Sequence, residues 1–85
     1  VNICINNDPS IALEEAGSFL ADYYNIQFSA DRTRDWTAHG SPRDCARVLT
    51  EYKGSGVKHI ALRIASRDQK GQFDRFLNDV VPLLN

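Results

Sequence analysis

The feature that most restricts the fold is a strand-type segment near each end of an otherwise helical sequence. Residues 1–6 alternate apolar Val1, Ile3 and Ile5 with smaller or polar side chains, which is the period of a β-strand. A second run, residues 57–65, places Ile60, Leu62 and Ile64 on one face and Ala61, Arg63 and Ala65 on the other. Strands separated by helices favour a parallel sheet joined by crossover connections.

Helix-start signals follow the first strand and flank the second. Asp8 can cap a helix that has Pro9 in its first position and runs to about Tyr24. Ser41-Pro42-Arg43-Asp44 has the pattern of a capping box and begins a second helix, which Gly54-Ser55-Gly56 ends. Residues 66–69 read S-x-x-Q and predict the start of a third helix, in whose last turn Pro82 bends or ends it.

The segment between the first two helices, residues 25–40, is the least regular part of the sequence. Ile26 and Phe28 suggest a short extended piece, and residues 31–35 are polar and expected to be exposed. A short third strand is possible near Trp36–His39. The expected order is therefore strand, helix, long loop, helix, strand, helix, which is an α/β fold with parallel strands.

The composition limits the classes of protein to which this chain can belong. Eighty-five residues make a single domain, residues 1–85. The net charge is −1, and the Lys and Arg residues are scattered except for a loose cluster at Arg32, Arg34 and Arg43, so we expect no nucleic-acid binding. No apolar run approaches the ~20 residues that span a bilayer, and no signal-peptide pattern opens the chain. The expectation is a cytoplasmic protein without a membrane partner.

Two cysteines occur, Cys4 in a strand-type run and Cys45 in a helix-type run. Neither has the Cys or His spacing of a zinc site, so we expect no metal. Two buried free thiols are the favoured interpretation, and a disulfide between them stays open at this point.

An ordered set of motifs resembles the bacterial luciferase-like flavin- or deazaflavin-dependent monooxygenases. It comprises the run from Gly40 to Arg47, then Leu49, Tyr52 and Gly56-Val57-Lys58-His59 ahead of an apolar strand, and the closing Val80-Val81-Pro82-Leu83-Leu84. The N-terminal strand ending in Asn-Asp and the helix with ALEEA and Phe-Leu-x-x-Tyr-Tyr fit the preceding unit of that family's barrel. The similarity covers essentially the whole chain.

The resemblance implies the C-terminal quarter of a (β/α)8 barrel that binds FMN or a deazaflavin coenzyme and oxidises small organic substrates. A complete barrel has eight strands and about 250 residues, so this chain alone supplies only part of one. We therefore expect a partial barrel, β-α-loop-α-β-α, that lacks catalytic competence alone, with its catalytic residues unknown. Two strands with an open face further predict a homo-oligomer that covers this face.

The resemblance singles out five residues for binding. Gly40 and Ser41, at a helix N-terminus, and Arg63, on the inward strand face, are candidates for a cofactor phosphate. Trp36 and His39 are candidates for a substrate pocket. The alternatives are an Arg63 that simply faces solvent and a Trp36 that pins the long connection to the core. His59, at the opposite end of its strand, is expected to be structural.

Two further functions remain open from the sequence. One is a small noncatalytic α/β module that self-associates. The other is a binder of a small-molecule ligand whose pocket forms between protomers.

Overall fold

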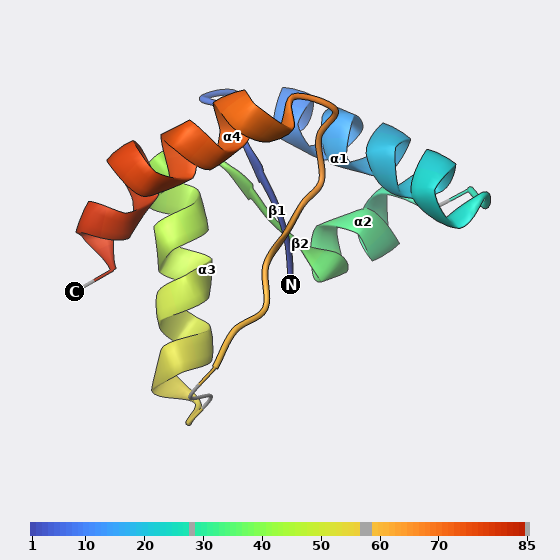
Figure 1. Cartoon of the computed structure of the whole chain (residues 1–85). Coiled ribbons are helices and arrows are strands. Elements are labelled where there is room, and N and C mark those ends of the chain that lie inside the picture. The colour runs from blue at the N-terminus through green and yellow to red at the C-terminus, as the bar shows by residue number, and fades with distance from the viewer. Residues whose placement is uncertain (28, 57–58, 85) are drawn as a thin grey trace.

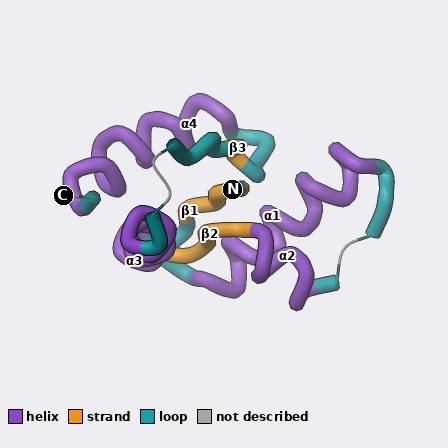
Figure 2. Tube along the Cα trace, turned by 90° about the horizontal axis from the view of Figure 1, so that it is seen from below, coloured by secondary structure: helices purple, strands orange, loops and turns teal. Residues whose placement is uncertain are grey.

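A three-stranded parallel sheet lies at the centre of the computed structural model, which describes residues 1–27, 29–56 and 59–84. The strands are β1 (Asn2–Ile5), β2 (Thr37–Gly40) and β3 (Arg63–Ile64). Figure 1 shows β1 and β2 between the helices, and Figure 2 shows all three strands, whose spatial order is β2-β1-β3. In β1, Asn2 is paired with Thr37 of β2 and with Arg63 of β3, whereas Ile5 is paired with Gly40. The predicted α/β class with parallel strands is confirmed.

The helices begin where local capping chemistry places them. Asp8 accepts a hydrogen bond from Ser10 N at the start of α1 (Pro9–Tyr24). Ser41 and Asp44 form the predicted capping box at the start of α3 (Pro42–Gly54). The C-terminal segment consists of α4 (Gln69–Arg75), the π-helical turn η1 (Phe76–Val80) and the 3₁₀ turn η2 (Val81–Leu83), so regular helix ends ahead of Pro82 as expected.

Helices cover both faces of the sheet (Figure 2). On one face, Cys4 packs with α1 and with Ala65 in a cluster of fully buried side chains: Ala12, Ala16 and Leu20. On the other face, Ile3 and Ile5 pack with α3 and η1, in a cluster that includes Ala38, Cys45, Ala46, Leu49 and Val80. The alternation of β1 thus sends its side chains into two separate cores.

The expected open sheet face is not present in this structure. All four residues of β1 are buried within a single copy of the chain, because α1 lies over the face that we expected to need a neighbour. The strand order also differs from the consecutive order of a barrel segment, since β1 lies between β2 and β3. The connection from β1 to β2 and the connection from β2 to β3 run in opposite directions across the sheet. Right-handed connections that run in opposite directions place their helices on opposite faces of the sheet.

The long connection is more regular than predicted. It contains the helix α2 (Ala30–Trp36), which Ser29 caps by accepting a hydrogen bond from Arg32 N, and then β2, the short third strand suggested near Trp36–His39. Thr33 is the buried residue of α2, and its neighbours are exposed. Phe28, expected to anchor the loop, lies outside the described residues.

The last strand is shorter than predicted. Only Arg63–Ile64 pair with β1 as a strand, although the Ala61 carbonyl oxygen accepts a hydrogen bond from the Val1 N-terminus at 2.9 Å, and residues 57–58 are outside the described part. The predicted alternation holds, because Ile60 and Ile64 pack on the α3 side and Ala65 packs on the α1 side.

The start of α4 differs from the expected capping box. Asp68, not Ser66, caps the helix by accepting a hydrogen bond from Gly71 N. Ser66 instead accepts from Asp68 N, and Gln69 donates to the carbonyl oxygens of Ile64 and Ser66. The two polar side chains thus shape the turn that precedes the helix.

Both cysteines are free and fully buried. They belong to different clusters, Cys4 on the α1 side of β1 and Cys45 on the α3 side. Burial raises the pKa of each thiol to about 12, and for Cys4 the nearby Glu15 adds to this effect. Both thiols therefore stay protonated and poorly nucleophilic near neutral pH.

Candidate functional site

The residues predicted for a cofactor phosphate do not come together. Gly40 and Ser41 lie at the carboxyl end of β2, where Gly40 is opposite Ile5. Arg63 lies at the other end of β1, opposite Asn2, and on the far side of that strand. Because a strand rises about 3.3 Å per residue, the three-residue offset along β1 alone separates them by about 10 Å.

The N-terminus of α3 is already occupied by a carboxylate of the same chain. The Asp44 carboxylate accepts a hydrogen bond from Ser41 N at 3.0 Å, and Asp44 N donates to the Ser41 hydroxyl at 3.2 Å. The hydrogen bond from the Ser41 backbone is the main reason that the pKa of Asp44 lies below its ordinary value. A phosphate here would meet a negative charge, so this end of α3 does not fit the phosphate of a flavin.

Gly40 is needed for this arrangement. It has a φ of +115°, and a Cβ atom at this position would lie 2.6 Å from an Asp44 carboxylate oxygen. The glycine therefore permits the turn that brings Asp44 over the start of α3.

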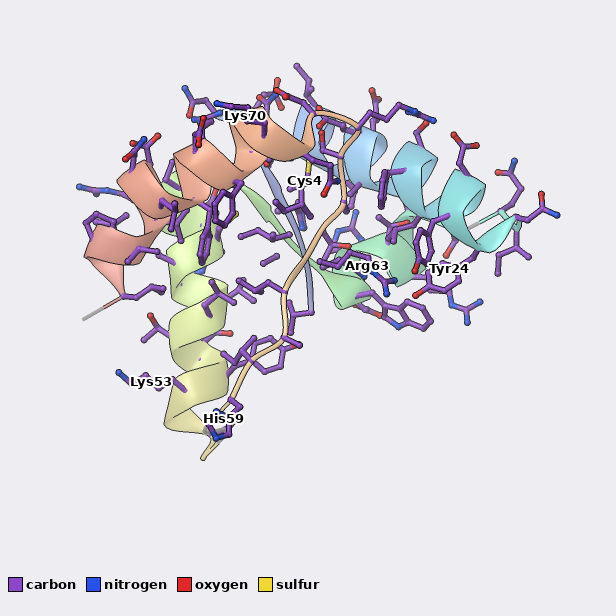
Figure 3. All side chains as sticks on the ribbon, viewed as in Figure 1. Cys4, Tyr24, Lys53, His59, Arg63 and Lys70 are labelled. Atoms are coloured by element: carbon purple, nitrogen blue, oxygen red, sulfur yellow. The ribbon has the colours of Figure 1, made fainter. Side chains whose placement is uncertain are left out.

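Arg63 lies against two aromatic rings of α1 (Figure 3). Its guanidinium carbon is 4.3 Å from the centroid of the Tyr23 ring, and the guanidinium donates a hydrogen bond to the Tyr24 hydroxyl at 2.6 Å. These contacts hold the C-terminal end of α1 to the start of β3. Arg63 is exposed, as the solvent-facing alternative predicts, and its contacts hold it against the surface of α1.

Trp36 does not pin the long connection into the core as expected. Its ring is 43% exposed, and the Arg32 guanidinium lies over it at 4.7 Å from the ring centroid. Trp36 lines neither the groove at His39 nor the apolar cavity described below, so its pocket role stays a prediction.

His39 lies in a groove of about 380 Å³ along β2, at an edge of the sheet. Its Nδ1 is 3.1 Å from the carbonyl oxygen of Thr37. A carbonyl can only accept, so in the neutral ring Nδ1 carries the hydrogen and Nε2 keeps a lone pair. The groove is also lined by charges of both signs, from Arg34, Asp35, Asp44 and Arg47. His59, by contrast, is exposed and away from this groove.

The carboxyl ends of β1 and β3 form the place where open α/β sheets bind ligands, because the crossovers diverge there. In this chain Gln72 of α4 fills that place. Its side chain accepts a hydrogen bond from Ile5 N at 2.8 Å and donates to the Ile5 carbonyl oxygen at 2.9 Å. Gln72 thus continues the ladder beyond the short β3 and closes the crevice.

Sequence reasoning missed one cation near this end of the sheet. Arg67, three residues after the end of β3, is paired with Asp22 of α1 and donates to the Ser18 hydroxyl at 3.3 Å. Its side chain therefore reaches the α1 side of the sheet. Its place in the turn that follows the last predicted strand is the signal in the sequence that could have pointed to this residue.

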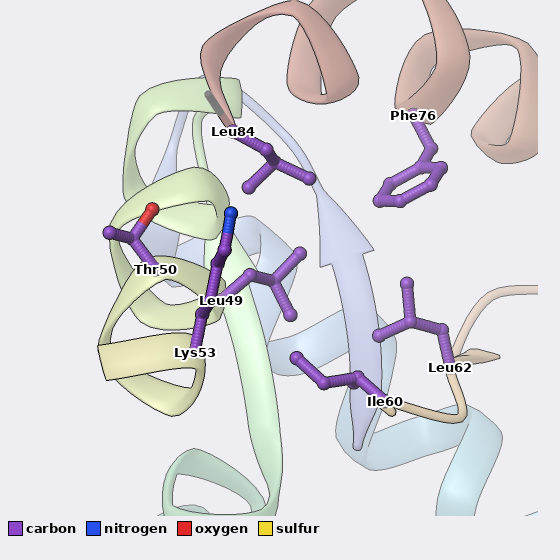
Figure 4. Close-up of a pocket in the computed structure, with 7 residues that line it drawn as sticks. All are labelled: Leu49, Thr50, Lys53, Ile60, Leu62, Phe76 and Leu84. Atoms are coloured by element: carbon purple, nitrogen blue, oxygen red, sulfur yellow. The ribbon is translucent and has the colours of Figure 1, made fainter. Parts of the chain in front are cut away.

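A second, apolar cavity of about 570 Å³ lies on the opposite side, between α3, residues 60–62 and the C-terminal segment. Its walls are mostly aliphatic, and among the described residues Lys53 is the charged one that lines it (Figure 4). Sequence reasoning did not find it, because it forms between elements that are far apart in the chain.

Across residues 1–27, 29–56 and 59–84, no group of three or more His, Cys, Asp and Glu side chains could hold a metal ion. Within the same residues, no helix is long and apolar enough to cross a membrane. Comparison of the chain with protein-family models, with curated proteins and with solved structures finds no match.

Proposed function

We propose that this chain is a C-terminal segment of a luciferase-like flavin- or deazaflavin-dependent monooxygenase barrel and is not catalytic alone. The observation that carries the proposal is the pairing of β1 with β3. These strands are parallel neighbours, and α3, which connects to β3, and η1, which continues α4 after it, pack on the same face of β1. Two neighbouring units of a (β/α)8 barrel share this strand pairing and this placement of the two helices, although a barrel has helices on its outer side only.

The remaining elements fit the proposal if α1 is a cover that replaces the missing barrel. In a barrel, the face of β1 that bears Cys4 would point inward. Here α1 lies on that face and seals it with Ala12, Ala16 and Leu20. The strand β2 pairs with the edge of β1 that an earlier strand of a barrel would use. An isolated segment would thus satisfy its own open face and edge.

The site geometry favours a different residue for binding a phosphate from those that the sequence suggested. Barrel enzymes bind ligands at the carboxyl ends of their strands. Arg63 is at the opposite end of β3, and Asp44 occupies the α3 terminus, whereas Arg67 follows the carboxyl end of β3 on the α1 side. We therefore assign Arg67 as the anion-binding residue of the completed barrel. The isolated chain, in which Asp22 neutralises Arg67, should not take up flavin.

Reconstitution tests this proposal. The chain is mixed with the remainder of a luciferase-like barrel that lacks its own last two βα units, and FMN fluorescence is followed. The expected result is quenching in the mixture and none with either part alone. Arg67→Met should abolish the quenching, and the matched control Arg63→Met should keep it. Absence of any association between the two parts would overturn the proposal.

A second proposed property is self-association through the sheet edges. The strands β2 and β3 are the outer strands of the sheet, and Leu62 next to β3 is 36% exposed. Unpaired strand edges beside apolar side chains are sites of association. The solution mass should therefore be a multiple of the 9.6 kDa chain, measured by light scattering. A monomer at all accessible concentrations would exclude this property and leave the barrel proposal intact.

A further inference from the structure

The apolar cavity between α3 and the C-terminal segment has a composition unlike that of any other concavity described above. Five of its seven lining residues are apolar and come from three separate segments: Leu49, Ile60, Leu62, Phe76 and Leu84. Leu49 is 4% exposed and belongs to the core, and Ile60, Phe76 and Leu84 pack against that core from three sides. The base of the cavity is therefore formed by the core, and Figure 4 shows the side chains that line it.

Lys53 is the charged side chain among the described residues that line this cavity. Among the described residues it forms no ion pair, whereas Lys70 is paired with Asp74 at 3.1 Å. The last carbonyl groups of α3 are bonded to the backbone N–H groups of Ser55 and Gly56, so they do not require the Lys53 ammonium. The ammonium is therefore available to an anion at the mouth.

The other polar lining residue cannot take the place of Lys53. The Thr50 hydroxyl donates its hydrogen to the carbonyl oxygen of Ala46 at 2.7 Å. Since a hydroxyl has one hydrogen, Thr50 has none left for an anionic ligand. Recognition of a negative charge at this cavity depends on Lys53.

We propose that this cavity binds a medium-chain aliphatic carboxylate, with the hydrocarbon chain against the leucine and isoleucine walls and the carboxylate at Lys53. The volume of about 570 Å³ lies within the range of about 300–1,000 Å³ that small-molecule pockets have. An aliphatic wall with one cation at its rim matches an apolar chain that carries one negative charge. A dianion or a polar sugar would leave charges or hydroxyl groups against apolar walls without partners.

The first test is a chain-length series measured by calorimetry on the whole chain. The probes are octanoate, decanoate and dodecanoate, each below its micellar concentration. Each added methylene that is buried should tighten the Kd by about fourfold, until the cavity is full. Decanol, which has the same chain without the charge, should bind more weakly than decanoate by about two- to fivefold, the range of a solvent-exposed ion pair. No saturable binding, or no dependence on chain length, would overturn the proposal.

The second test uses variants at the mouth of the cavity. Lys53→Met should weaken decanoate binding by the same two- to fivefold and leave decanol binding unchanged. Lys53→Arg should retain the affinity, and Lys70→Met, a matched loss of a lysine elsewhere, should have no effect. Equal losses for decanoate and decanol in Lys53→Met would refute the role of the charge. Circular dichroism checks that each variant is folded, which is expected because Lys53 is exposed.

This site is independent of the proposed flavin enzyme. The cavity lies on the α3 side of the sheet, whereas the proposed flavin side is the face under α1. Carboxylate binding is measured on the isolated chain and flavin binding only on the reconstituted barrel, so failure of one leaves the other unaffected.

Discussion

The two faces of the central strand β1 are covered by side chains of different size. Under α1, Cys4 meets Ala12, Ala16 and Ala65, which are all small and fully buried, and Leu20 completes the cluster. Under α3 and η1, the buried side chains are larger, and several partly exposed ones surround them. An apolar cavity lies on this second side, beside residues 60–62, which precede the two-residue strand β3.

The difference shows how side-chain size and strand length determine how closely the helices pack against each face of the sheet. Small residues allow α1 to pack closely against the sheet. On the α3 side, the helices are held apart by larger side chains, and the two-residue β3 provides too little sheet to fill the space. The tight face should therefore be sensitive to changes in volume, and the open face should tolerate them.

The largest effect is expected from Leu20→Ala on the tight face. Leu20 is 0% exposed, and its truncation should lower the free energy of unfolding by about 2–5 kcal/mol. The control Leu77→Ala, at a residue that is 47% exposed on η1, should change it by less than about 0.5 kcal/mol. Urea unfolding followed by circular dichroism measures both. Equal losses would show that the two sides do not differ in packing.

The next effect concerns the way α4 is attached to the sheet. Gln72→Leu removes the partners of the Ile5 N–H and C=O groups, which stay buried. Leaving two buried polar groups unsatisfied should cost about 2–4 kcal/mol in the free energy of unfolding. Gln27→Leu, at an exposed residue, is the control and should have little effect. A Gln72 variant as stable as the native chain would show that these hydrogen bonds add nothing.

Substitutions that enlarge a side chain on each face compare the packing of the two faces directly. Ala16→Leu adds atoms to a fully buried contact between α1 and the sheet and should cost about 1–3 kcal/mol. Leu62→Phe adds atoms at the open cavity and should change the free energy of unfolding by less than about 0.5 kcal/mol. The same urea experiment gives both values. A larger cost at residue 62 than at residue 16 would reverse the comparison.

The smallest effect is the acid dependence of the α3 cap. The pKa of Asp44 is lowered in the folded chain, chiefly by the hydrogen bond from Ser41 N. A depressed carboxyl pKa stabilises the fold above the unfolded pKa of about 3.9, and this contribution is lost as the pH falls through the lower folded value. Asp44→Asn should reduce the loss of stability below about pH 4, measured by urea unfolding at several pH values. An unchanged acid slope would contradict the role of this carboxylate.

The sequence was sufficient for features that depend on neighbouring residues. Asp8-Pro9 and Ser41-Pro42 predicted the starts of α1 and α3, because a helix cap is a local structure. It was insufficient for α2, whose cap Ser29 and buried Thr33 lie within a polar segment that reads as a loop. The strand at residues 57–65 was predicted but its short length was not, since the extent of pairing depends on the geometry of β1 and not on the alternation of residues 60–65.

The binding features were less accessible from the sequence. Gly40 and Ser41 do precede a helix, as predicted. The carboxylate of Asp44, which belongs to the same motif, occupies the N-terminus of that helix where an anion would bind. Arg63 was placed on the correct strand face, but the pairing register puts it at the end away from ligands. The cavity at Lys53 and the crevice closed by Gln72 arise from contacts between distant segments, which periodicity does not encode.

Hydrogen exchange of the reconstituted barrel tests the central claim most directly, namely that α1 covers a face which belongs to the barrel interior. Amide exchange is measured for α1 and α3 in the isolated chain and in the mixture with the rest of a luciferase-like barrel. The account predicts that α1 amides exchange faster in the mixture, as the helix leaves the sheet, while α3 amides remain protected. Unchanged protection of α1 in a mixture that binds FMN would contradict it.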